Sequence, residues 1–404
     1  MKTVLLLGSF DTKGEEYAFV ERLIVSQGHG ALKVDFGTMG RPQGITADIG
    51  PEQVAEAAGR SLQELRERND RGHAMAAMSR GTAEIVKRLY AEGRFHAVLG
   101  MGGSGGSSVI SAAMRTLPLH VPKVLVSTIA SGQASAITGT RNIVMIPSVV
   151  DVSGINRISE IIYRQAVGAV CGMLQASDGM DAGEARKPVV AITMFGNTTP
   201  CVDKCRERLT GLGYEVIVFH GTGAGGRAME ELVEDGLINA VLDITTTEWA
   251  DELCGGIFTA GPTRLEAPGR KGIPHLIAPG CLDMVNFGPI DTVPAKYANE
   301  RLVEWNPMIT LMRTNVEQNR KFGRIFAEKA NRSAGPVCFM IPTKGFSQLD
   351  SPGNPFWWPE ADQAMVRSLK ETLRPGIPVI ELDAHINDAV FADRAVDQLL
   401  RMMN

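Results

Sequence analysis

The residues best suited to binding chemistry lie in the segment Leu99–Ser108, which reads LGMGGSGGSS. An apolar run precedes its glycines, and the apolar-periodic segment Val109–Met114 follows them. Glycines allow a close approach of the backbone to an anion, and the helix that follows directs its free N–H groups at that anion. We therefore predict that this loop binds the phosphates of a nucleotide or of another phosphorylated ligand. The predicted phosphate-binding residues are Gly102, Gly103, Ser104, Gly105, Gly106 and Ser107.

The sequence around the loop restricts the type of nucleotide that we expect to bind. Gly100, Gly102 and Gly105 fit the pattern G-x-G-x-x-G, but a dinucleotide site also needs an acidic residue roughly 20 residues later. The sequence from Gly106 to Gly139 contains no Asp or Glu, which disfavours NAD, and no Walker-type motif occurs anywhere. A tight turn that needs small residues only for packing remains the alternative.

Charged residues near predicted strand ends offer further contacts, because ligands of open parallel sheets bind beyond the carboxyl ends of the strands. Lys13, followed by Gly14, stands between a strand and a helix and is expected to contact a phosphate. Asp11 and Asp151 stand at strand ends, and either is a candidate to hold Mg²⁺ through its waters. Helix capping is the alternative role for both aspartates.

A second turn of small residues follows the predicted strand Lys123–Ser127. Its residues Thr128, Ser131 and Gly132 are expected to close over a phosphate or a base. A purely structural turn is equally compatible with this sequence.

Reactive side chains also follow strands in the second half of the chain. Lys344, Asp383 and His385 are the candidate catalytic residues, because a histidine beside a carboxylate acts as a general base and a lysine stabilises an oxyanion. The triplet TKG occurs at Thr12–Gly14 and again at Thr343–Gly345. A structural role for His385 is the alternative.

Composition excludes several classes of function. The 404 residues carry a net charge of −4 with no Lys/Arg-rich block, which argues against nucleic-acid binding. No uncharged apolar run reaches the roughly 18–20 residues of a membrane span, so no membrane association is expected. The 6 cysteines lack zinc-site spacing. We expect reduced thiols and a cytoplasmic location.

The order of elements predicts the fold class, because apolar strands alternate with amphipathic helices throughout the chain. We expect an α/β protein with two Rossmann-like, doubly wound domains, each with a mostly parallel sheet, over residues 1–182 and 183–404. Similar segments, VLLLGSFDTKGEEY and VAITMFGNTTPCVD, open the two halves and suggest an internal duplication. Within this scheme we predict a helix over Pro51–Asn69, a helix over Asn299–Arg332 with a break at Asn306-Pro307, and a short strand over Ala74–Met78.

Several motifs together resemble one known family. They are GSFDTKGEE, FGTMGRP, SRGT, GMGGSGGSS, STIASG, IPSVVD, APGCLDMVNFG and PTKGFSQLDSPGNPFWWP. In this order they resemble bacterial members of the Tm-one-like ATP-binding family, named for the ATP-binding half of a tomato mosaic virus resistance protein. The resemblance spans essentially the whole chain. It implies two Rossmann-like subdomains, ATP binding in the first half and a homodimer.

From these observations we expect an ATP-binding protein that binds the nucleotide together with Mg²⁺. The ligand is expected on the N-terminal domain, in the cleft between the domains, and a small acidic or sugar-like compound is a possible second partner. Two alternatives stay open. One is a metabolic enzyme that acts on a small phosphorylated or carboxylated compound through Lys344 and His385. The other is a regulatory protein whose dimer state or domain closure is set by ATP.

Overall fold

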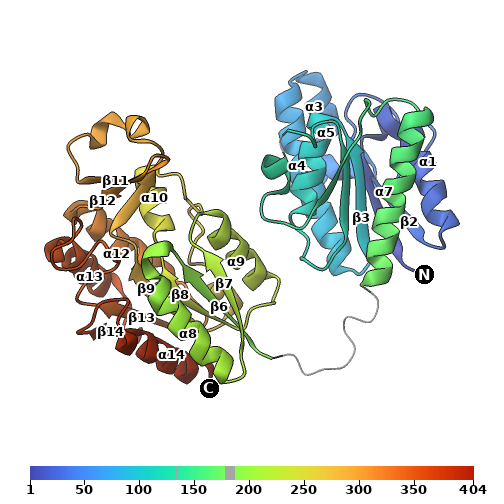
Figure 1. The fold of residues 1–404 in the computed structure, drawn as a ribbon. Helices are drawn as coiled ribbons and strands as arrows, with labels where there is room; N and C mark the ends of the chain where they lie inside the picture. Colours follow the sequence, from blue (N-terminus) through green and yellow to red (C-terminus); the bar gives the residue numbers. More distant parts are fainter. Residues whose placement is uncertain (133, 178–186) are drawn as a thin grey trace. The chain divides into compact units, whose positions relative to one another are not determined.

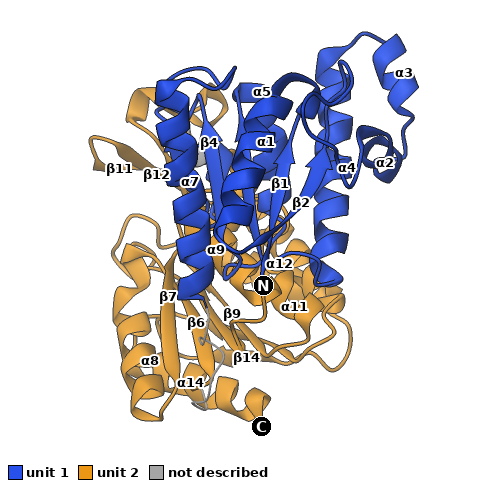
Figure 2. Cartoon of the chain, turned by 90° about the vertical axis from the view of Figure 1, so that its right-hand side faces the viewer, with its two compact units in different colours: residues 1–184 blue, residues 185–404 orange. Residues whose placement is uncertain are grey.

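The structure of the protein is a computed structural model that describes residues 1–132, 134–177 and 187–404. The chain divides into two compact units, Met1–Glu184 and Ala185–Asn404, coloured separately in Figure 2. The domain boundary expected between residues 182 and 183 lies outside the described residues.

Unit 1 is built on a parallel five-stranded sheet with the order β2-β1-β3-β4-β5 (Figure 1). Its strands are β1 (Thr3–Gly8), β2 (Gly30–Asp35), β3 (Ala97–Gly102), β4 (Lys123–Ser127) and β5 (Val144–Pro147). Its helices are α1 (Phe10–Ser26), α2 (Pro51–Ala57), α3 (Leu62–Glu67), α4 (Arg71–Ala91), α5 (Ser104–Met114), α6 (Ala134–Thr138) and α7 (Arg157–Ala176). Helices α1 and α7 pack on one face of the sheet, whereas α4 and α5 pack on the other. Because both faces are covered, the central strands are apolar runs.

Strand order reverses between β1 and β3, where the connections leave to opposite sides of the sheet. In doubly wound sheets this switch point is where ligands bind, beyond the carboxyl ends of the strands. The buried Tyr17 side chain spans this point. Its hydroxyl lies within hydrogen-bond distance of the carbonyl oxygens of Leu7 in β1 and Met101 in β3, and it accepts the Met101 N–H at 2.6 Å.

Unit 2 repeats this order in a parallel six-stranded sheet, β14-β13-β9-β8-β6-β7, and adds the antiparallel sheet β10-β12-β11. The strands are β6 (Val189–Met194), β7 (Glu215–His220), β8 (Ala240–Thr245), β9 (His275–Gly280), β10 (Met284–Phe287), β11 (Leu302–Asn306), β12 (Ile309–Arg313), β13 (Val337–Pro342) and β14 (Val379–Leu382). The α-helices are α8 (Thr199–Gly211), α9 (Ala224–Glu234), α10 (Glu248–Cys254), α11 (Ala267–Lys271), α12 (Val316–Asn331), α13 (Pro359–Thr372) and α14 (Ala389–Met403). Three short 3₁₀ turns are η1 (Gly196–Thr198), η2 (Ile290–Thr292) and η3 (Ala295–Tyr297). The first five parallel strands of each unit thus share one order, as a duplicated α/β domain requires.

Three predicted elements are wrong. The strand predicted at Ala74–Met78 lies inside helix α4, because Ala and Met are good helix formers and Asp70 caps this helix by accepting the His73 N–H at 2.9 Å. The helix predicted over residues 51–69 is broken at Gly59, whose φ is +68°.

The helix predicted over residues 299–332 is instead the β11–β12 hairpin followed by α12. Pro307 cannot continue a helix, and the Asn306 side chain accepts the Met308 N–H at 2.9 Å, which closes the hairpin turn.

The six cysteines are free and buried. Cys171 lies in α7 of unit 1, whereas the other five lie in unit 2.

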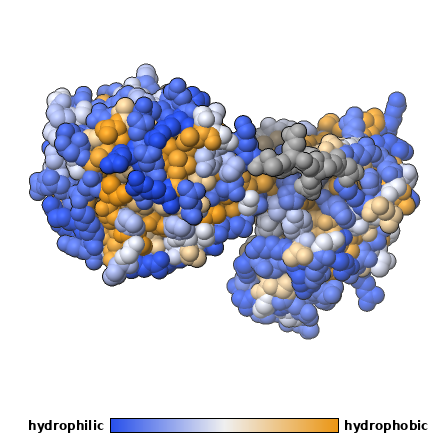
Figure 3. Space-filling view, turned by 90° about the horizontal axis from the view of Figure 1, so that it is seen from below, coloured by the Kyte–Doolittle hydropathy of each residue, from blue (hydrophilic) through white to orange (hydrophobic). Residues whose placement is uncertain are grey.

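Hydrophilic residues cover much of the face seen in Figure 3, and hydrophobic residues gather there in patches. Exposed apolar side chains occur in both units, among them Val149, which is 73% exposed, and Met308, which is 67% exposed. Among the described residues, no helix combines the length and the apolar character needed to cross a bilayer.

Candidate functional site

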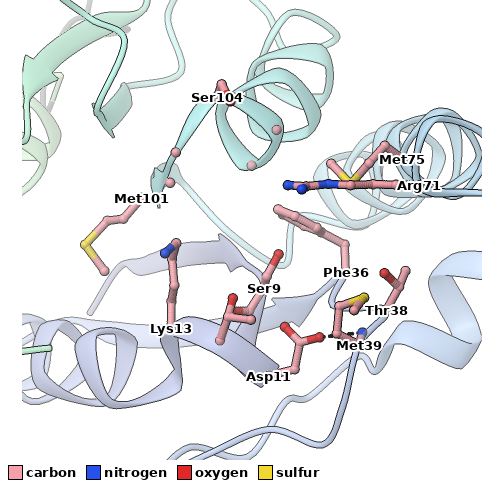
Figure 4. Close-up of a pocket in the computed structure, with 15 residues that line it drawn as sticks. Ser9, Asp11, Lys13, Phe36, Thr38, Met39, Arg71, Met75, Met101 and Ser104 are labelled. Atoms are coloured by element: carbon pink, nitrogen blue, oxygen red, sulfur yellow. Dashed lines mark hydrogen bonds between the residues drawn. The ribbon is translucent and has the colours of Figure 1, made fainter. Parts of the chain in front are cut away.

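A cavity of about 410 Å³ opens at the switch point of unit 1. Residues that follow β1, β2 and β3 line it, together with two residues of α4 (Figure 4). Its volume lies within the range of roughly 300–1,000 Å³ that is usual for small-molecule sites. The predicted phosphate loop forms one wall, since residues 102–106 all line the cavity.

The backbone amides of the glycine loop are available to a ligand. Helix α5 begins at Ser104, and its N-cap, Gly103, has no side chain to satisfy the first N–H groups. The Ser107 N–H donates to the Gly103 carbonyl at 2.8 Å, but the N–H groups of Ser104, Gly105 and Gly106 have no acceptor in the described part of the chain. A Cβ at Gly106 would meet nothing within 4 Å, so this part of the loop is open.

Two cationic side chains contribute to the same cavity. Lys13 lies at a kink in α1, where its φ is −135°, and its ammonium group donates to the Val152 carbonyl. The exposed Arg71 makes no hydrogen bond or ion pair with any described residue. Its Nη2 atom is 3.8 Å from the position that a Cβ on Gly105 would occupy. Because a guanidinium binds phosphate oxygens well, these cations complement the amides of the loop.

The cavity also has an apolar wall. Phe36, Met39, Met75 and Met101 line it, and Met75 Cε lies 3.4 Å from the Cβ position of Gly105. Methionine side chains adapt to flat apolar ligands, so this wall suits a nucleobase.

Asp11 holds the cavity wall in place. It is 6% exposed, and its Oδ2 atom accepts the N–H groups of Met39 at 2.7 Å and Gly40 at 3.2 Å. Its Oδ1 atom is enclosed and unpartnered among the described residues. The neighbouring Asp35 accepts the N–H groups of Phe10 and Gly37 at 2.9 and 2.8 Å, and burial raises its pKa above the usual value. These two carboxylates therefore fix the loops that follow β1 and β2.

Two of the predicted ligand-binding residues, Ser107 and Gly14, have structural roles. Ser107 is fully buried, and its hydroxyl lies 2.6 Å from that of Ser127, which joins the loop to β4. Gly14 packs against the backbone, because a Cβ there would lie 1.8 Å from the Gln43 carbonyl oxygen.

The structure divides the remaining predicted residues of unit 1 between two cavities. Thr128, Ser131 and Asp151 line a second cavity, at the ends of β4 and β5, whereas Asp11 lines the first. Gly132 is exposed in the same turn as Ser131. Within the described ranges no group of three or more His, Cys, Asp or Glu side chains is placed to hold a metal ion.

The predicted catalytic group of unit 2 is engaged in holding loops together. Lys344 pairs with Asp383 at 3.0 Å, and the side chains are 52% and 82% exposed. His385 lies 2.9 Å from the Ser347 carbonyl through Nε2, and its Nδ1 accepts the Asn387 N–H at 3.1 Å. This pattern assigns the proton to Nε2 and leaves no free lone pair for a general base.

Unit 2 also has a glycine-rich helix start, at α9, but a carboxylate of the chain fills it. Glu248 accepts the N–H groups of Gly223 at 2.7 Å and Gly226 at 3.1 Å. The buried Arg264 holds Glu248 at 2.7 Å and contacts both oxygens of Asp243 at 2.6 Å. This arginine keeps the pKa of Asp243 well below its usual value against the effect of burial.

Sequence reasoning missed Phe36, Arg71 and Met75. The predicted strand at residues 74–78 concealed the helical spacing that places Arg71 and Met75 four residues apart on one face of α4. A helix assignment for this segment is the signal that could have found Arg71 and Met75.

Comparison with known proteins gives matches along the whole chain. Two models described as "Uncharacterised protein family (UPF0261)", for the N-terminal and C-terminal domains, match residues 2–179 and 187–403. A UPF0261 protein of Clostridium tetani is 45% identical over 403 residues, covering 100% of this chain and 99% of that protein.

The ToMV resistance protein Tm-1(GCR237) of Solanum lycopersicum is 44% identical over 338 residues. The match covers 82% of this chain and 45% of the tomato protein. Among solved structures, a putative UDP-N-acetylglucosamine 2-epimerase from Listeria monocytogenes aligns over 68% of this chain and 78% of its own at 10% identity, with a TM-score of 0.26. The matches to the two domain models and to the bacterial and plant relatives show that this chain belongs to the UPF0261 family.

Proposed function

We propose that unit 1 binds ATP in the cavity at the switch point, with the phosphates on the N-terminus of α5. The observation that carries this proposal is the set of N–H groups at Ser104, Gly105 and Gly106, which have no acceptor among the described residues and line the same cavity as two cationic side chains. An anion in this position meets aligned amides, the positive end of the helix dipole and a guanidinium. The apolar wall formed by Phe36 and the methionines accommodates the base.

We propose that Mg²⁺ enters with the nucleotide. Mg²⁺ keeps several waters and commonly binds through substrate phosphates rather than through an all-protein cage. This fits a cavity in which Asp11 has one oxygen bonded to two amides and the other enclosed. The ion would neutralise part of the phosphate charge.

Calorimetry with ATP, ADP, AMP, NAD and ribose 5-phosphate, with and without Mg²⁺, tests the proposal. Affinity is expected to fall from ATP to ADP to AMP, since each phosphate lost removes contacts with the loop. Lys13→Met and Arg71→Met are expected to weaken ATP binding about 10-fold or more each, because a charge-assisted hydrogen bond contributes roughly 1.5–3 kcal/mol. Lys271→Met, which removes an exposed lysine of α11 in unit 2, is the matched control and leaves affinity unchanged. Equal affinities for ATP and AMP, or tighter binding of NAD, contradict the proposal.

We also propose that the chain forms a homodimer, as the family resemblance implies. Strand β5 is an edge of its sheet, and its Val144 side chain is 37% exposed. Unpaired edges readily bind a second chain. Sedimentation velocity over a range of protein concentrations tests this, and a monomer at every concentration rejects it.

A further inference from the structure

The second cavity of unit 1 has the chemistry of a binding site for a neutral, hydroxylated molecule. Its volume is about 380 Å³, and it lies at the carboxyl ends of β4 and β5. Thr128, Ser131 and Ser148 contribute hydroxyl groups, and Asp151 contributes a carboxylate. None of the described residues that line it is a lysine, arginine, histidine or aromatic residue. An anionic ligand would therefore meet a negative charge with no cation to balance it.

Two polar side chains of this cavity have no partner among the residues that the structure describes. Ser148 is only 4% exposed, and its side chain makes no hydrogen bond with any described residue. The nearby Ser127 differs, because its hydroxyl is bonded to that of Ser107. The exposed Asp151 likewise forms no hydrogen bond or ion pair with the described part of the chain. The described residues thus leave the Ser148 hydroxyl available to a hydroxyl group of a ligand in this cavity.

This cavity adjoins the proposed ATP site. Gly102, Ser127 and Pro147 lie in register across β3, β4 and β5. Because neighbouring strands are about 4.8 Å apart, the end of β5 lies roughly 10 Å from the glycine loop.

Two contacts join the cavities. The Thr128 N–H donates to the Gly102 carbonyl at 3.3 Å, and Lys13, which lines the first cavity, holds the Val152 carbonyl next to Asp151. A terminal phosphate on the loop is thus within reach of a molecule in the second cavity.

The turn between Ser148 and Asp151 is strained. Val149 has a φ of +62°, although it is β-branched and 73% exposed, and the Val150 N–H donates to the Ser148 carbonyl at 2.6 Å. Left-handed backbone at a β-branched residue is an outlier of the kind that clusters at ligand sites. Here the strained turn presents Ser148 and Asp151 to one cavity.

We propose that the second cavity binds a small polyol or aldose, and that the terminal phosphoryl group of ATP is transferred to one of its hydroxyls. This inference rests on ATP binding as proposed above. The acceptor oxygen forms a bond to phosphorus while the bond from phosphorus to the β–γ bridging oxygen breaks, and ADP leaves with that electron pair. Asp151 takes the proton of the acceptor hydroxyl. The α5 amides and Lys13 stabilise the charge on the transferred group.

The test measures ADP release by the full chain with Mg·ATP alone and with glycerol, erythritol, xylitol, mannitol, ribose or glucose. At least one of these acceptors is expected to raise the rate 10-fold or more above ATP alone, and glycerate or gluconate to raise it less. Asp151→Asn is expected to lower the acceptor-dependent kcat about 100-fold, as loss of a general base does. Its Kd for Mg·ATP, measured by calorimetry, should stay within about twofold of the wild type. Asp203→Asn, which alters an exposed carboxylate of α8, is the matched control and leaves both quantities unchanged.

Three outcomes overturn the inference. If no acceptor raises ADP release while ATP still binds, the acceptor site is wrong and the proposed ATP site stands. If Asp151→Asn weakens binding of Mg·ATP but not of ATP alone, then Asp151 is a metal ligand rather than the base. If calorimetry detects no ATP binding, both proposals fail. Ser148→Ala is compared with the wild type by saturation-transfer NMR of the same polyols in the presence of a non-hydrolysable ATP analogue. This measurement separates loss of acceptor binding from loss of turnover.

Discussion

Replacing Gly103 with aspartate should stabilise helix α5 and weaken ATP binding at the proposed site about 100-fold. Gly103 is the N-cap of α5 and has φ −75° and ψ −169°, an extended conformation that aspartate adopts readily. The nearest atom to a Cβ placed there is Thr128 Oγ1 at 3.8 Å, so the new side chain fits. Its carboxylate would accept N–H groups of the first turn, which are otherwise available to a phosphate.

The chain itself shows that a carboxylate can occupy such a position. Glu248 binds the N–H groups of Gly223 and Gly226 at the start of α9. Gly103→Asp would create the equivalent interaction in unit 1.

The two effects have opposite signs and different sizes. Aspartate gains a few tenths of a kcal/mol over glycine as an N-cap, and a negative charge near a helix N-terminus adds about 0.3–1 kcal/mol. The melting temperature of unit 1 should therefore stay constant or rise by about 2–4 °C. A bound phosphate would lose two charge-assisted hydrogen bonds of roughly 1.5 kcal/mol each, which corresponds to about 100-fold weaker binding of ATP.

Titration calorimetry measures the affinity for ATP, and differential scanning calorimetry on the same preparations measures the melting temperature. Gly103→Ala is the steric control and should keep affinity within about threefold, because it neither caps nor carries a charge. Gly103→Asn caps without a charge and should give an intermediate loss. A folded Gly103→Asp protein that binds ATP within threefold of the wild type would refute the assignment of phosphate to these amides.

Three further predictions concern stability. Tyr17→Phe removes a hydroxyl that is hydrogen-bonded to Leu7 and Met101. Denaturant titration should therefore show a loss of about 1–3 kcal/mol in the free energy of unfolding of unit 1, and an unchanged value contradicts this prediction. Val149→Gly removes the strain of a left-handed φ at an exposed position. The free energy of unfolding of unit 1 should therefore rise by about 1 kcal/mol despite the flexibility of glycine, and a decrease would show that packing of the valine side chain stabilises the unit. Burial raises the pKa of Asp283 to about 7, above an unfolded value of about 3.9, so its contribution to the stability of unit 2 is full below about pH 4 and is lost as pH rises toward 7. Asp283→Asn should remove that part of the pH dependence in urea titrations from pH 4 to 8, and parallel curves for the two proteins would contradict it.

Local sequence patterns predicted the features that depend on neighbouring residues. The apolar runs of β1 and β3 and the glycines after β3 placed the parallel sheet and the loop of the candidate site. Features that depend on distant residues could not be predicted in this way. Arg264 reaches Asp243, 21 residues earlier, and no motif indicates such a pair. The hydrogen bonds of both His385 ring nitrogens to backbone groups could not be predicted either, because they depend on the path of the loop around Ser347.

The buried thiols can report local unfolding of each unit. Cys171 belongs to unit 1 and the other five cysteines to unit 2, so thiol modification followed by peptide mass analysis reads the opening of each unit separately. Burial raises the pKa of Cys171 above its ordinary value, which further slows its reaction while the helix stays packed. A ligand that stabilises unit 1 should therefore protect this thiol without any engineered label.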